Sequence, residues 1–338
     1  MRVAVLGAGA MGSALALHLQ RRGHRVRLWA TPRDGPVMEA LAAGEVHPAL
    51  GVRVPAELVR PGTAEEGFRR SQKVILFENR ALEGALEGAD AVLLGLSSEG
   101  LGAEWRRLKS RIGGRPVLNI AKGLYRGPRG RVVPFSSLAG RKEAALGGPT
   151  IAREVGLGRP SAAVVAGERG PRALWTRALD GPGLRVVPLR DRVGVEVCGA
   201  LKNVYAIGLG AVEGLRRKRG WETLDNLHAA LFARSLGEMS ALSRAAGGEA
   251  STAYTVAGAG DLEVTARAGR NYGFGVLLGS GHSVDGAAGR VGSTVEGART
   301  ARLAARMAAQ RGLDLPLLKA VRSLLGGGGR AEDLLDLA

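Results

Sequence analysis

The sequence predicts an α/β domain with a parallel sheet, followed by a mainly helical domain. Over the first half of the chain, short β-branched segments alternate with amphipathic segments, which is the pattern of a parallel sheet covered by helices. Beyond Asp191 the strand patterns stop and long helical patterns follow. We therefore expect a boundary near residue 190, with a first domain at 1–190 and a second at 191–338.

The expected elements follow these patterns along the chain. Strands are expected at residues 2–6, 25–29, 73–77, 91–96, 116–121, 162–166 and 184–187. A helix is expected from Ala10 to Arg22, ended by Gly23, and the segment 48–61 is expected to be irregular and exposed. In the second domain, helices are expected at residues 195–212, 224–246, 298–309 and 315–325, and a glycine turn at 326–329 precedes a short terminal helix.

Composition favours a globular protein without disulfide bonds. The hydrophobic fraction is 45% and the charged fraction is 23%, both near the average for soluble proteins. The single cysteine, Cys198, excludes an intrachain disulfide and suits a reducing compartment. No run approaches the roughly 20 apolar residues of a membrane span, and Met1–Leu6 runs into a glycine turn and not into a signal-peptide pattern. We therefore expect a soluble, cytoplasmic protein.

The chain is strongly basic, with 48 Lys and Arg against 31 Asp and Glu and a formal net charge of +17. Such a balance raises the question of nucleic-acid binding. Most basic residues are scattered, however, and only 4% of the chain is aromatic, so few side chains are available to stack on bases. We expect no nucleic-acid partner, whereas an anionic, phosphate-bearing substrate is compatible with the charge.

The run Gly7-Ala8-Gly9-Ala10-Met11-Gly12 follows an expected strand and opens an expected helix. In that context G-x-G-x-x-G is the fingerprint of a Rossmann-type dinucleotide-binding domain. Gly7 permits the tight turn, Gly9 lets the backbone approach a pyrophosphate, and Gly12 allows close packing of the helix on the sheet. The helix N-terminus supplies free N–H groups. A purely structural glycine turn is the alternative.

The residues after the second expected strand bear on the choice between NAD and NADP. A Rossmann enzyme that requires the ribose 2′-hydroxyl of NAD places Asp or Glu at the end of this strand. Here the strand ends in Trp29-Ala30-Thr31-Pro32-Arg33. The missing carboxylate favours NADP or the use of both cofactors. Arg33 is a candidate partner for the 2′-phosphate, with an ordinary loop arginine as the alternative.

Polar residues interrupt the apolar helix expected at 195–212. Lys202 and Asn203 stand among small and apolar residues, and lysine is rarely buried without a partner. Lys202 therefore either extends to the surface or occupies a polar pocket. Asp261, at a glycine-framed bend, is a candidate partner for a buried ammonium group, although Asp is also a common helix N-cap.

Arg270 and Lys122 are candidates for contact with an anionic ligand. Arg270 follows Gly269 and precedes an expected helix, and its planar guanidinium suits bidentate contact with phosphate. Lys122 follows an expected strand, at the carboxyl edge of the sheet where ligands bind in doubly wound folds. An exposed loop arginine is the alternative for Arg270.

These motifs together resemble the NAD(P)-dependent glycerol-3-phosphate dehydrogenase family, and its archaeal-type members in detail. The matching segments lie in the family's order over nearly the whole chain, and the segment around Lys202 is the most specific of them. The segments are Gly7-Ala8-Gly9-Ala10-Met11-Gly12, Lys122-Gly123-Leu124, Gly148-Pro149-Thr150-Ile151-Ala152-Arg153-Glu154, Gly199-Ala200-Leu201-Lys202-Asn203-Val204-Tyr205, Gly260-Asp261-Leu262, Arg270-Asn271 and Val295-Glu296-Gly297.

The resemblance implies interconversion of dihydroxyacetone phosphate and glycerol 3-phosphate with NAD or NADP, supplying phospholipid synthesis. It implies that Lys202 donates and accepts the proton. With the residues above, the candidate substrate contacts are Lys122, Gly148, Thr150, Lys202, Asn203, Asp261, Arg270 and Asn271. The candidate cofactor contacts are Gly7, Gly9, Ala10, Met11, Gly12, Arg33, Lys122, Ala152, Arg270 and Glu296. Taken alone, Gly148-Pro149 is also compatible with a plain turn and Glu296 with a surface carboxylate.

The chain departs from the family in two places. Most bacterial members have Gly-Trp-Gly where this chain has Ala10-Met11-Gly12, and they have Ser at the place of Gly269. We expect backbone N–H groups to replace the serine hydroxyl, and we expect affinity and cofactor preference to change more than the reaction.

Two other functions fit part of the sequence. Another Rossmann enzyme with a helical second domain, such as a ketopantoate reductase or a 3-hydroxyacid dehydrogenase, fits the glycine turn but not the Arg270-Asn271 region. A dinucleotide-sensing module without turnover would not need the lysine, aspartate and arginine. The five histidines and one cysteine show no metal-ligand spacing, so no metal is expected. The apolar helices of the second domain are compatible with a homodimer.

Overall fold

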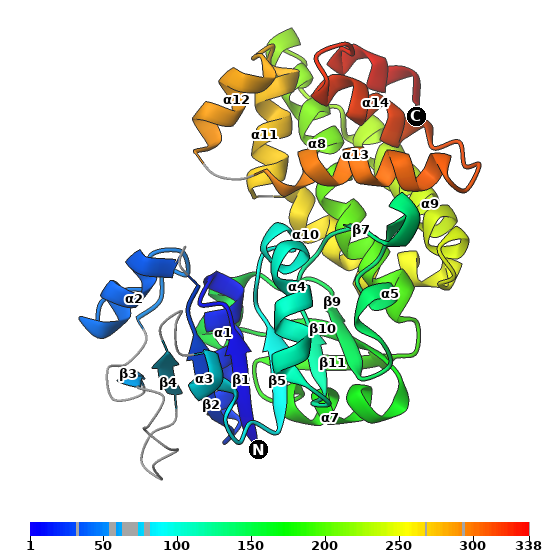
Figure 1. Ribbon diagram of the computed structural model, residues 1–338. Helices are drawn as coiled ribbons and strands as arrows, with labels where there is room; N and C mark the ends of the chain where they lie inside the picture. Colours follow the sequence, from blue (N-terminus) through cyan, green and yellow to red (C-terminus); the bar gives the residue numbers. More distant parts are fainter. Residues whose placement is uncertain are drawn as a thin grey trace. The chain divides into compact units, whose positions relative to one another are not determined.

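The computed structural model describes residues 1–31, 34–53, 59–62, 74–77, 82–267, 269–292 and 295–337. It divides into two compact units (Figure 1). The first unit comprises Met1–Ala121, Ala139–Leu146 and Thr150–Arg190, and the second comprises Lys122–Leu138, Gly147–Pro149 and Asp191–Ala338. Besides the run that follows residue 190, the second unit thus includes two short segments from the first half of the chain.

Nine strands in the described residues of the first unit form one sheet, in the order β11-β10-β9-β6-β5-β1-β2-β4-β3. Each strand pairs in parallel with its neighbour along the series β3, β4, β2, β1, β5, β6 and β9. The strands β10 and β11 also form a parallel pair. The strands are β1 (Arg2–Leu6), β2 (Arg25–Trp29), β3 (Val59–Gly62), β4 (Val74–Phe77), β5 (Ala91–Leu94), β6 (Val117–Asn119), β9 (Glu143–Gly147), β10 (Ser161–Gly167) and β11 (Leu184–Leu189).

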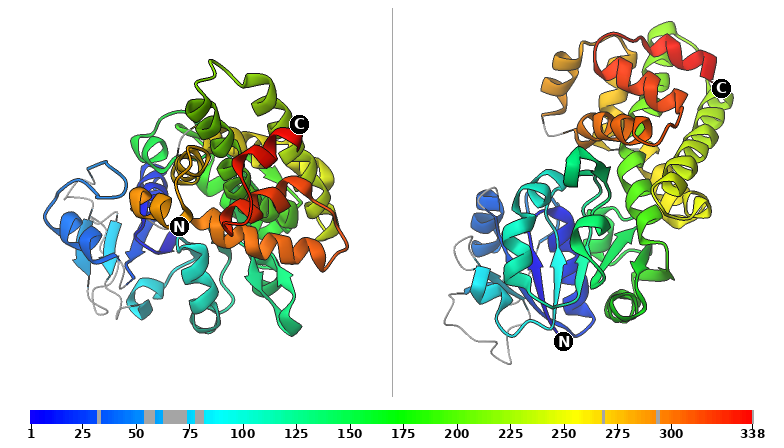
Figure 2. Two further views of the ribbon diagram at one scale, coloured as in Figure 1. Left: turned by 90° about the horizontal axis from the view of Figure 1, so that it is seen from above. Right: turned by 45° about the vertical axis from the view of Figure 1, so that its right-hand side comes forward.

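Helices pack on this sheet in two groups (Figures 1 and 2). One group is α1 with α6 and α7, and the other is α3 with α4. Their bounds are α1 (Ala10–Arg21), α3 (Leu82–Leu86), α4 (Ser98–Ile112), α6 (Ala152–Leu157) and α7 (Arg169–Leu179), and α2 (Gly35–Ala42) follows β2. The core of the unit includes the buried residues Val5, Leu15, Leu93 and Trp175. The predicted parallel sheet covered by helices is therefore confirmed.

The expected strands are confirmed with small shifts at their ends, but two further strands of this sheet, β3 and β9, were not expected. The strand β9, Glu143–Gly147, contains no β-branched residue, so local propensity does not reveal it. The strand β3, Val59–Gly62, occupies part of the segment expected to be irregular. It lies at the edge of the sheet, where a proline such as Pro61 is tolerated.

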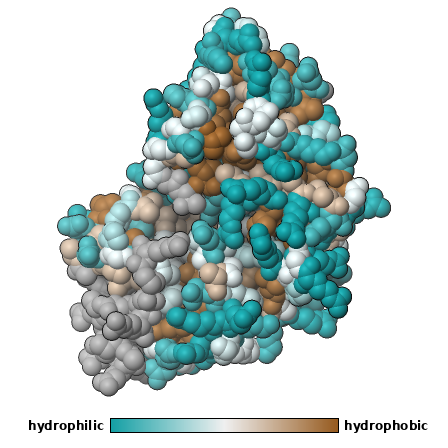
Figure 3. Space-filling view, turned by 45° about the horizontal axis from the view of Figure 1, so that its top comes forward, coloured by the Kyte–Doolittle hydropathy of each residue, from teal (hydrophilic) through white to brown (hydrophobic). Residues whose placement is uncertain are grey.

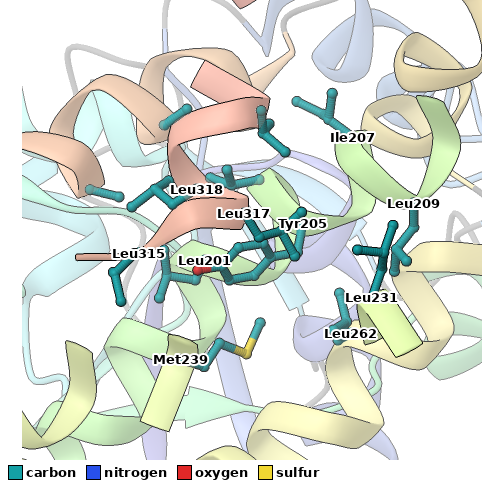
Figure 4. Packing of buried hydrophobic residues seen from close by; sticks show 14 of the residues in the cluster. Leu201, Tyr205, Ile207, Leu209, Leu231, Met239, Leu262, Leu315, Leu317 and Leu318 are labelled. Carbon is teal, nitrogen blue, oxygen red and sulfur yellow. The ribbon is translucent and has the colours of Figure 1, made fainter. Parts of the chain in front are cut away.

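The second unit is helical, as predicted, and is centred on the long helix α8 (Arg192–Arg219). Leu201 and Tyr205 of this helix pack with Met239, Leu317 and Leu318, and all five side chains are buried in the hydrophobic core of the unit (Figure 4). The other helices are α9 (Asp225–Ala245), η5 (Ala250–Tyr254), η6 (Val256–Gly260), α10 (Asp261–Arg267), α11 (Arg270–Gly279), α12 (Val284–Val291), α13 (Glu296–Ala309), α14 (Pro316–Leu325) and η7 (Ala331–Leu337). A hairpin, β7 (Tyr125–Arg126) and β8 (Val132–Val133), encloses η4 (Pro128–Gly130) and leads to α5 (Ser136–Ala139).

The helix α8 is long and apolar enough to cross a membrane, judged by length and composition alone. This corrects the expectation that no segment reaches that limit. Every residue of its 18-residue apolar window is buried inside the protein. A helix that is apolar on all sides and buried on all sides is the central helix of a packed core.

Four glycines bring α8 and α11 into backbone contact. A Cβ atom on any of them would overlap a backbone carbonyl oxygen of the facing helix. They are Gly210 and Gly214 on α8, and Gly275 and Gly279 on α11. At the start of α11, Asn271 also contacts α8, through the side chain of Asn203.

The densest run of basic residues, Arg216–Arg219, is partly neutralised. Arg216 and Arg217 each form an ion pair with Glu213 at 2.7 Å, and these contacts lower the pKa of Glu213 to about 2. Arg219 pairs with Glu332 at 3.2 Å. On the face drawn in Figure 3, hydrophilic residues are interspersed with apolar ones.

Candidate active site

The glycine turn lies at the carboxyl end of β1, which has β2 on one side and β5 on the other. Gly7 has a φ of +117°, and a Cβ atom there would lie 2.6 Å from the carbonyl oxygen of Gly95, which follows β5. Only glycine fits such a position. A Cβ atom on Gly12 would overlap the Gly7 carbonyl oxygen. The turn thus lies where the strand order reverses, which is the dinucleotide site of doubly wound sheets.

Gly9 differs from Gly7 and Gly12 because open space surrounds it. A Cβ atom on Gly9 would meet no atom within 4 Å. Gly9 is the N-cap of α1, and no side chain caps this helix. Ala10 and Met11, which open the helix, are half-buried. Uncapped N–H groups beside an open glycine suit the pyrophosphate of a dinucleotide.

His47 and Ser13 stabilise the turn by hydrogen bonds to its backbone. Both donate to the carbonyl oxygen of Ala8, His47 through Nε2 and Ser13 through Oγ, each at 3.0 Å. Nδ1 of the buried His47 ring accepts the backbone N–H groups of Ala49 and Leu50, so Nε2 carries the ring proton. These hydrogen bonds fix the carbonyl group of Ala8, between Gly7 and Gly9.

Asp34 also bonds the turn, and sequence reasoning missed it. Its Oδ2 accepts the N–H of Ala8 at 3.3 Å and both the N–H and the hydroxyl of Thr31 at 2.8 Å. The Asp34 N–H in turn donates to the Thr31 carbonyl oxygen. Because the chain turns back here, a carboxylate does lie beside the end of β2, although β2 itself ends in apolar residues. Arg33 lies outside the described residues.

Lys202 occupies a polar pocket and does not extend to the surface. It is 8% exposed, and its Nζ donates to Asp261 Oδ1 at 2.5 Å and to Thr265 Oγ1 at 2.9 Å. Burial lowers the pKa of Lys202 to about 8; the carboxylate of Asp261 opposes this shift and the charge of Lys122 adds to it. A lysine with such a pKa exchanges its proton readily near neutral pH.

Asp261 joins two lysines. The fully buried carboxylate accepts from Lys202 through Oδ1 and from Lys122 through Oδ2, the latter at 2.7 Å. Lys122 also donates to the carbonyl oxygen of Gly148 at 3.4 Å. Asp261 begins α10 directly after the π-helical turn of η6, and its side chain bonds lysines and does not cap a helix. The structure thus brings together Lys122, Gly148, Lys202 and Asp261 within the second unit.

An amide network beside this cluster ties three helices together. Asn271 on α11 donates from Nδ2 to Asn203 Oδ1 on α8 at 3.1 Å. Its Oδ1 accepts the N–H of Gly297 on α13 at 3.0 Å. A Cβ atom on Gly297 would lie 2.5 Å from the Asn203 carbonyl oxygen. Asn203 and Asn271 are therefore positioned by α8, α11 and the start of α13.

Glu296 and Arg270 are the first residues of α13 and α11. Burial raises the pKa of the Glu296 carboxyl group, and the positive charges of Arg270, Lys202 and Lys122 oppose that rise. The Arg270 side chain is exposed, and its N-cap Gly269 has a φ of +124°. Such a backbone conformation favours glycine, which explains why serine is absent from this position.

The other predicted residues belong to the first unit. Thr150 begins the segment that leads into α6, and Ala152 is the first residue of that helix.

Thr265, in the second unit, was not predicted from the sequence. Its hydroxyl donates a hydrogen bond to the Asp261 carbonyl oxygen at 2.6 Å and accepts one from Lys202. Its spacing of four residues from Asp261 on a helix is a signal that could have revealed it. In the described part of the chain, no group of three His, Cys, Asp or Glu residues could hold a metal ion.

The first unit is a parallel sheet with a glycine turn at the point where its strand order reverses, and the helical unit that follows holds a buried lysine cluster. This combination is typical of two-domain dinucleotide-dependent dehydrogenases. The family model for the N-terminus of NAD-dependent glycerol-3-phosphate dehydrogenase matches residues 2–172. The model for the C-terminus of the same enzyme matches residues 191–336. The chain belongs to the NAD-dependent glycerol-3-phosphate dehydrogenase family.

Individual relatives match over almost the whole length. A protein of Archaeoglobus fulgidus named NADP(+)-dependent glycerol-3-phosphate dehydrogenase is 32% identical, over 99% of this chain and 98% of the relative. The glycerol-3-phosphate dehydrogenase [NAD(P)+] of Rhodospirillum rubrum is 35% identical, over 96% and 88%. The crystal structure of glycerol-3-phosphate dehydrogenase from Coxiella burnetii superposes with a TM-score of 0.81 at 29% identity, over 99% of this chain and 97% of that one.

Proposed function

We propose that the protein interconverts dihydroxyacetone phosphate and sn-glycerol 3-phosphate with NAD or NADP, using Lys202 as the proton donor and acceptor. The observation that carries this proposal is the buried cluster of Lys202, Asp261 and Lys122 in a chain of this family. The same observation argues against a dinucleotide-sensing module, because binding alone needs no buried lysine with a pKa near neutrality.

A nicotinamide dinucleotide held at the glycine turn would supply the hydride for reduction of the C2 carbonyl group of the ketone. As negative charge develops on the carbonyl oxygen, the ammonium group of Lys202 stabilises it and transfers one proton from Nζ to that oxygen, which gives the alcohol. In the reverse direction the neutral amine accepts this proton. With its pKa lowered to about 8, Lys202 can serve both directions near neutral pH.

Asp261 acts in this proposal as a positioning residue. Its carboxylate accepts from both lysines, so it fixes the direction of Nζ of Lys202 and offsets part of the repulsion between the two ammonium groups. The Thr265 hydroxyl holds the same Nζ from a second side. Lys122 and Gly148 are assigned to contacts with the substrate.

The phosphate of the substrate is assigned to Arg270, whose guanidinium suits an anion with two acceptor oxygens. Asn271 and Asn203, linked through their amides, complete the substrate contacts with Thr150. Gly7, Gly9, Ala10, Met11 and Gly12 would hold the pyrophosphate of the cofactor at the start of α1. Further cofactor contacts are assigned to Arg33, Lys122, Ala152, Arg270 and Glu296.

The test is an assay of the full-length protein with NADH and NADPH on three ketones. We expect oxidation with dihydroxyacetone phosphate to be much faster than with ketopantoate, and glycerol 3-phosphate to support the reverse reaction. Dihydroxyacetone is the matched control for the phosphate and should react poorly. Oxidation with dihydroxyacetone phosphate no faster than with ketopantoate would contradict the proposal and favour a ketopantoate reductase.

The setting of the reaction is also proposed. We infer a cytoplasmic enzyme that works as a homodimer in the direction of reduction and supplies glycerol phosphate to phospholipid synthesis. The one cysteine, Cys198, is buried and unpaired, which suits a reducing compartment. Exposed aromatic residues of the second unit, Trp221 and Tyr254, support association of two chains. Light scattering of the purified protein gives its mass, and a monomer at micromolar concentration would refute the homodimer.

A further inference from the structure

The segment Lys122–Leu138, which we call the strap, follows β6 in the chain but belongs to the helical unit. It begins at Lys122 and contains the hairpin of β7 and β8 and the start of α5. Leu124 and Val132 of the strap are buried and lie in the hydrophobic core of the helical unit. The first half of the chain thus supplies a part of that core, and the same segment carries a lysine of the site.

Two side chains from long helices bond the backbone of the strap. Directly after α13, Oε1 of Gln310 accepts the N–H of Val132 at 2.9 Å, and Nε2 donates to the Gly130 carbonyl oxygen at 3.1 Å. On α8, Oε2 of Glu196 accepts the N–H of Ser136 at 2.9 Å. Gln310 is exposed, whereas Glu196 is buried. The hairpin and the start of α5 are therefore tied to two helices that also carry residues of the candidate site.

At its beginning, the strap places Lys122 against α8. A Cβ atom on Gly199 would lie 3.5 Å from Cγ of Lys122, so the aliphatic part of the lysine passes over a position of the helix that has no side chain. Nζ of Lys122 then bonds the carboxylate of Asp261 at 2.7 Å, and this carboxylate also bonds Lys202. The place of the Lys122 charge beside Lys202 thus depends on where the strap holds its backbone.

The charged side chains near Lys202 and its partners come from several elements. They are Asp261 of α10, Lys122 of the strap, Glu296 of α13 and Arg270 of α11. On α9, Glu238 bonds Tyr205 of α8 and not Lys202. Burial lowers the pKa of Lys202 most; the carboxylate of Asp261 opposes this shift and the charge of Lys122 adds to it. A Lys122 side chain that is held less firmly would repel the ammonium group of Lys202 less and allow its pKa to rise.

We propose that Gln310 and Glu196 are positioning residues, which hold Lys122 beside Lys202 through the strap. They act through the backbone of the strap. The proposal rests on the function proposed above and adds two residues to it. Because Lys122 is assigned both to the substrate and to the repulsion of Lys202, a loosened strap should change substrate affinity and proton affinity together. An anchor that only stabilises the fold would change neither.

The first test measures the reduction of dihydroxyacetone phosphate against pH with the full-length variant Gln310→Ala. This variant removes both hydrogen bonds to the hairpin at an exposed place, so the protein should still fold. The pH at which the rate falls to half should rise by about 0.3 to 1 unit, because repulsion between the two lysines weakens. The KM for dihydroxyacetone phosphate should rise by about threefold to tenfold. Well below pH 8, kcat should stay within about twofold, since Lys202 is protonated there in both proteins.

The second anchor is tested by a pair of variants. Glu196→Ala removes the acceptor of the Ser136 N–H, so the midpoint and the KM should move in the same directions. Glu196→Gln keeps an oxygen that can accept this N–H and should keep the wild-type midpoint. Arg302→Ala is the matched control on α13. Arg302 is exposed and lines a cavity with Val284 of α12 and Ser323 of α14, so its loss should leave both quantities unchanged.

The proposal is overturned if Gln310→Ala keeps the wild-type midpoint and KM while its free energy of unfolding falls, because Gln310 then only stabilises the fold. A midpoint that moves to lower pH also overturns it. Equal shifts in Glu196→Gln and Glu196→Ala would refute the role of Glu196, and if Glu196→Ala does not fold, Gln310→Ala decides. Failure of the wild type to reduce dihydroxyacetone phosphate would instead refute the proposed function, and this proposal with it.

Discussion

The glycine turn and the lysine cluster are built by opposite means. The turn is backbone from one continuous run, and at Gly7 and Gly12 there is no room for a Cβ atom. The cluster is made of side chains from distant parts of the chain: Lys122, Lys202 and Asp261. Substitutions should therefore act on the turn through steric overlap and on the cluster through chemistry.

Replacing Lys202 should abolish chemistry and spare the fold. In Lys202→Met, we expect kcat to fall by about 10² to 10⁴-fold because the proton donor is lost. Asp261 keeps its ion pair with Lys122, so no buried charge is left alone. The dissociation constant of NADH should stay within about twofold, since the glycine turn is intact. Steady-state kinetics and fluorescence titration measure both quantities.

Lys319→Met is the control for this variant. Lys319 is an exposed lysine paired with Asp314, and its loss should leave kcat unchanged because exposed pairs contribute little. A Lys202→Met enzyme with the wild-type rate would refute the role assigned to Lys202.

In the turn, Gly12 and Gly9 should respond differently to alanine. A methyl group at Gly12 overlaps the Gly7 carbonyl oxygen, so Gly12→Ala should lower the free energy of unfolding by about 1–3 kcal/mol and weaken dinucleotide binding. Gly9 has open space around its Cβ position and an ordinary φ of −63°, so Gly9→Ala should leave the free energy of unfolding unchanged. The same variant should weaken the binding of NADH by roughly tenfold, because the methyl group blocks the place of the pyrophosphate. Urea denaturation and titration separate the two effects. Unaltered NADH binding by Gly9→Ala would show that the pyrophosphate lies elsewhere.

The contact of α8 with α11 extends the comparison to the second unit. Gly210→Ala places a methyl group onto the Tyr272 carbonyl oxygen and should lower the free energy of unfolding by about 1–3 kcal/mol. Gly237 is an exposed glycine in α9 with no atom near its Cβ position. Gly237→Ala should therefore raise stability by about 1 kcal/mol through helix propensity. Equal stability of both variants would mean that α8 and α11 do not pack this closely.

The sequence was sufficient for the fold where local patterns and packing agree. Alternating segments predicted β1, β2, β5, β10 and β11 closely, because β-branched residues there lie in a buried sheet. The strand β9 escaped because its Glu-Ala-Ala-Leu-Gly sequence becomes a strand through its neighbours in the sheet. Local propensity carries no information about such neighbours.

The site divides in the same way. The turn was predictable because its function lies in the spacing of three glycines. For Lys202 the sequence left burial and exposure equally open. Asp261 was a candidate partner for its ammonium group, and only resemblance joined Lys202 to Lys122. Thr265 and Asp34 were missed because a hydroxyl on a helix and an aspartate before a helix have common structural roles. Their contacts depend on where the backbone brings them.

The pH dependence of turnover tests the central claim, that Lys202 exchanges the proton, most directly. Since burial lowers the pKa of Lys202 to about 8, the rate of ketone reduction should fall as pH rises through about 8, when the donor loses its proton. The rate of alcohol oxidation should rise through the same pH, because the neutral amine is the acceptor. In Asp261→Asn the midpoint should move to lower pH, since the carboxylate raises the pKa of Lys202. A reduction rate that stays constant well above pH 8, or a midpoint that Asp261→Asn leaves in place, would contradict the assignment.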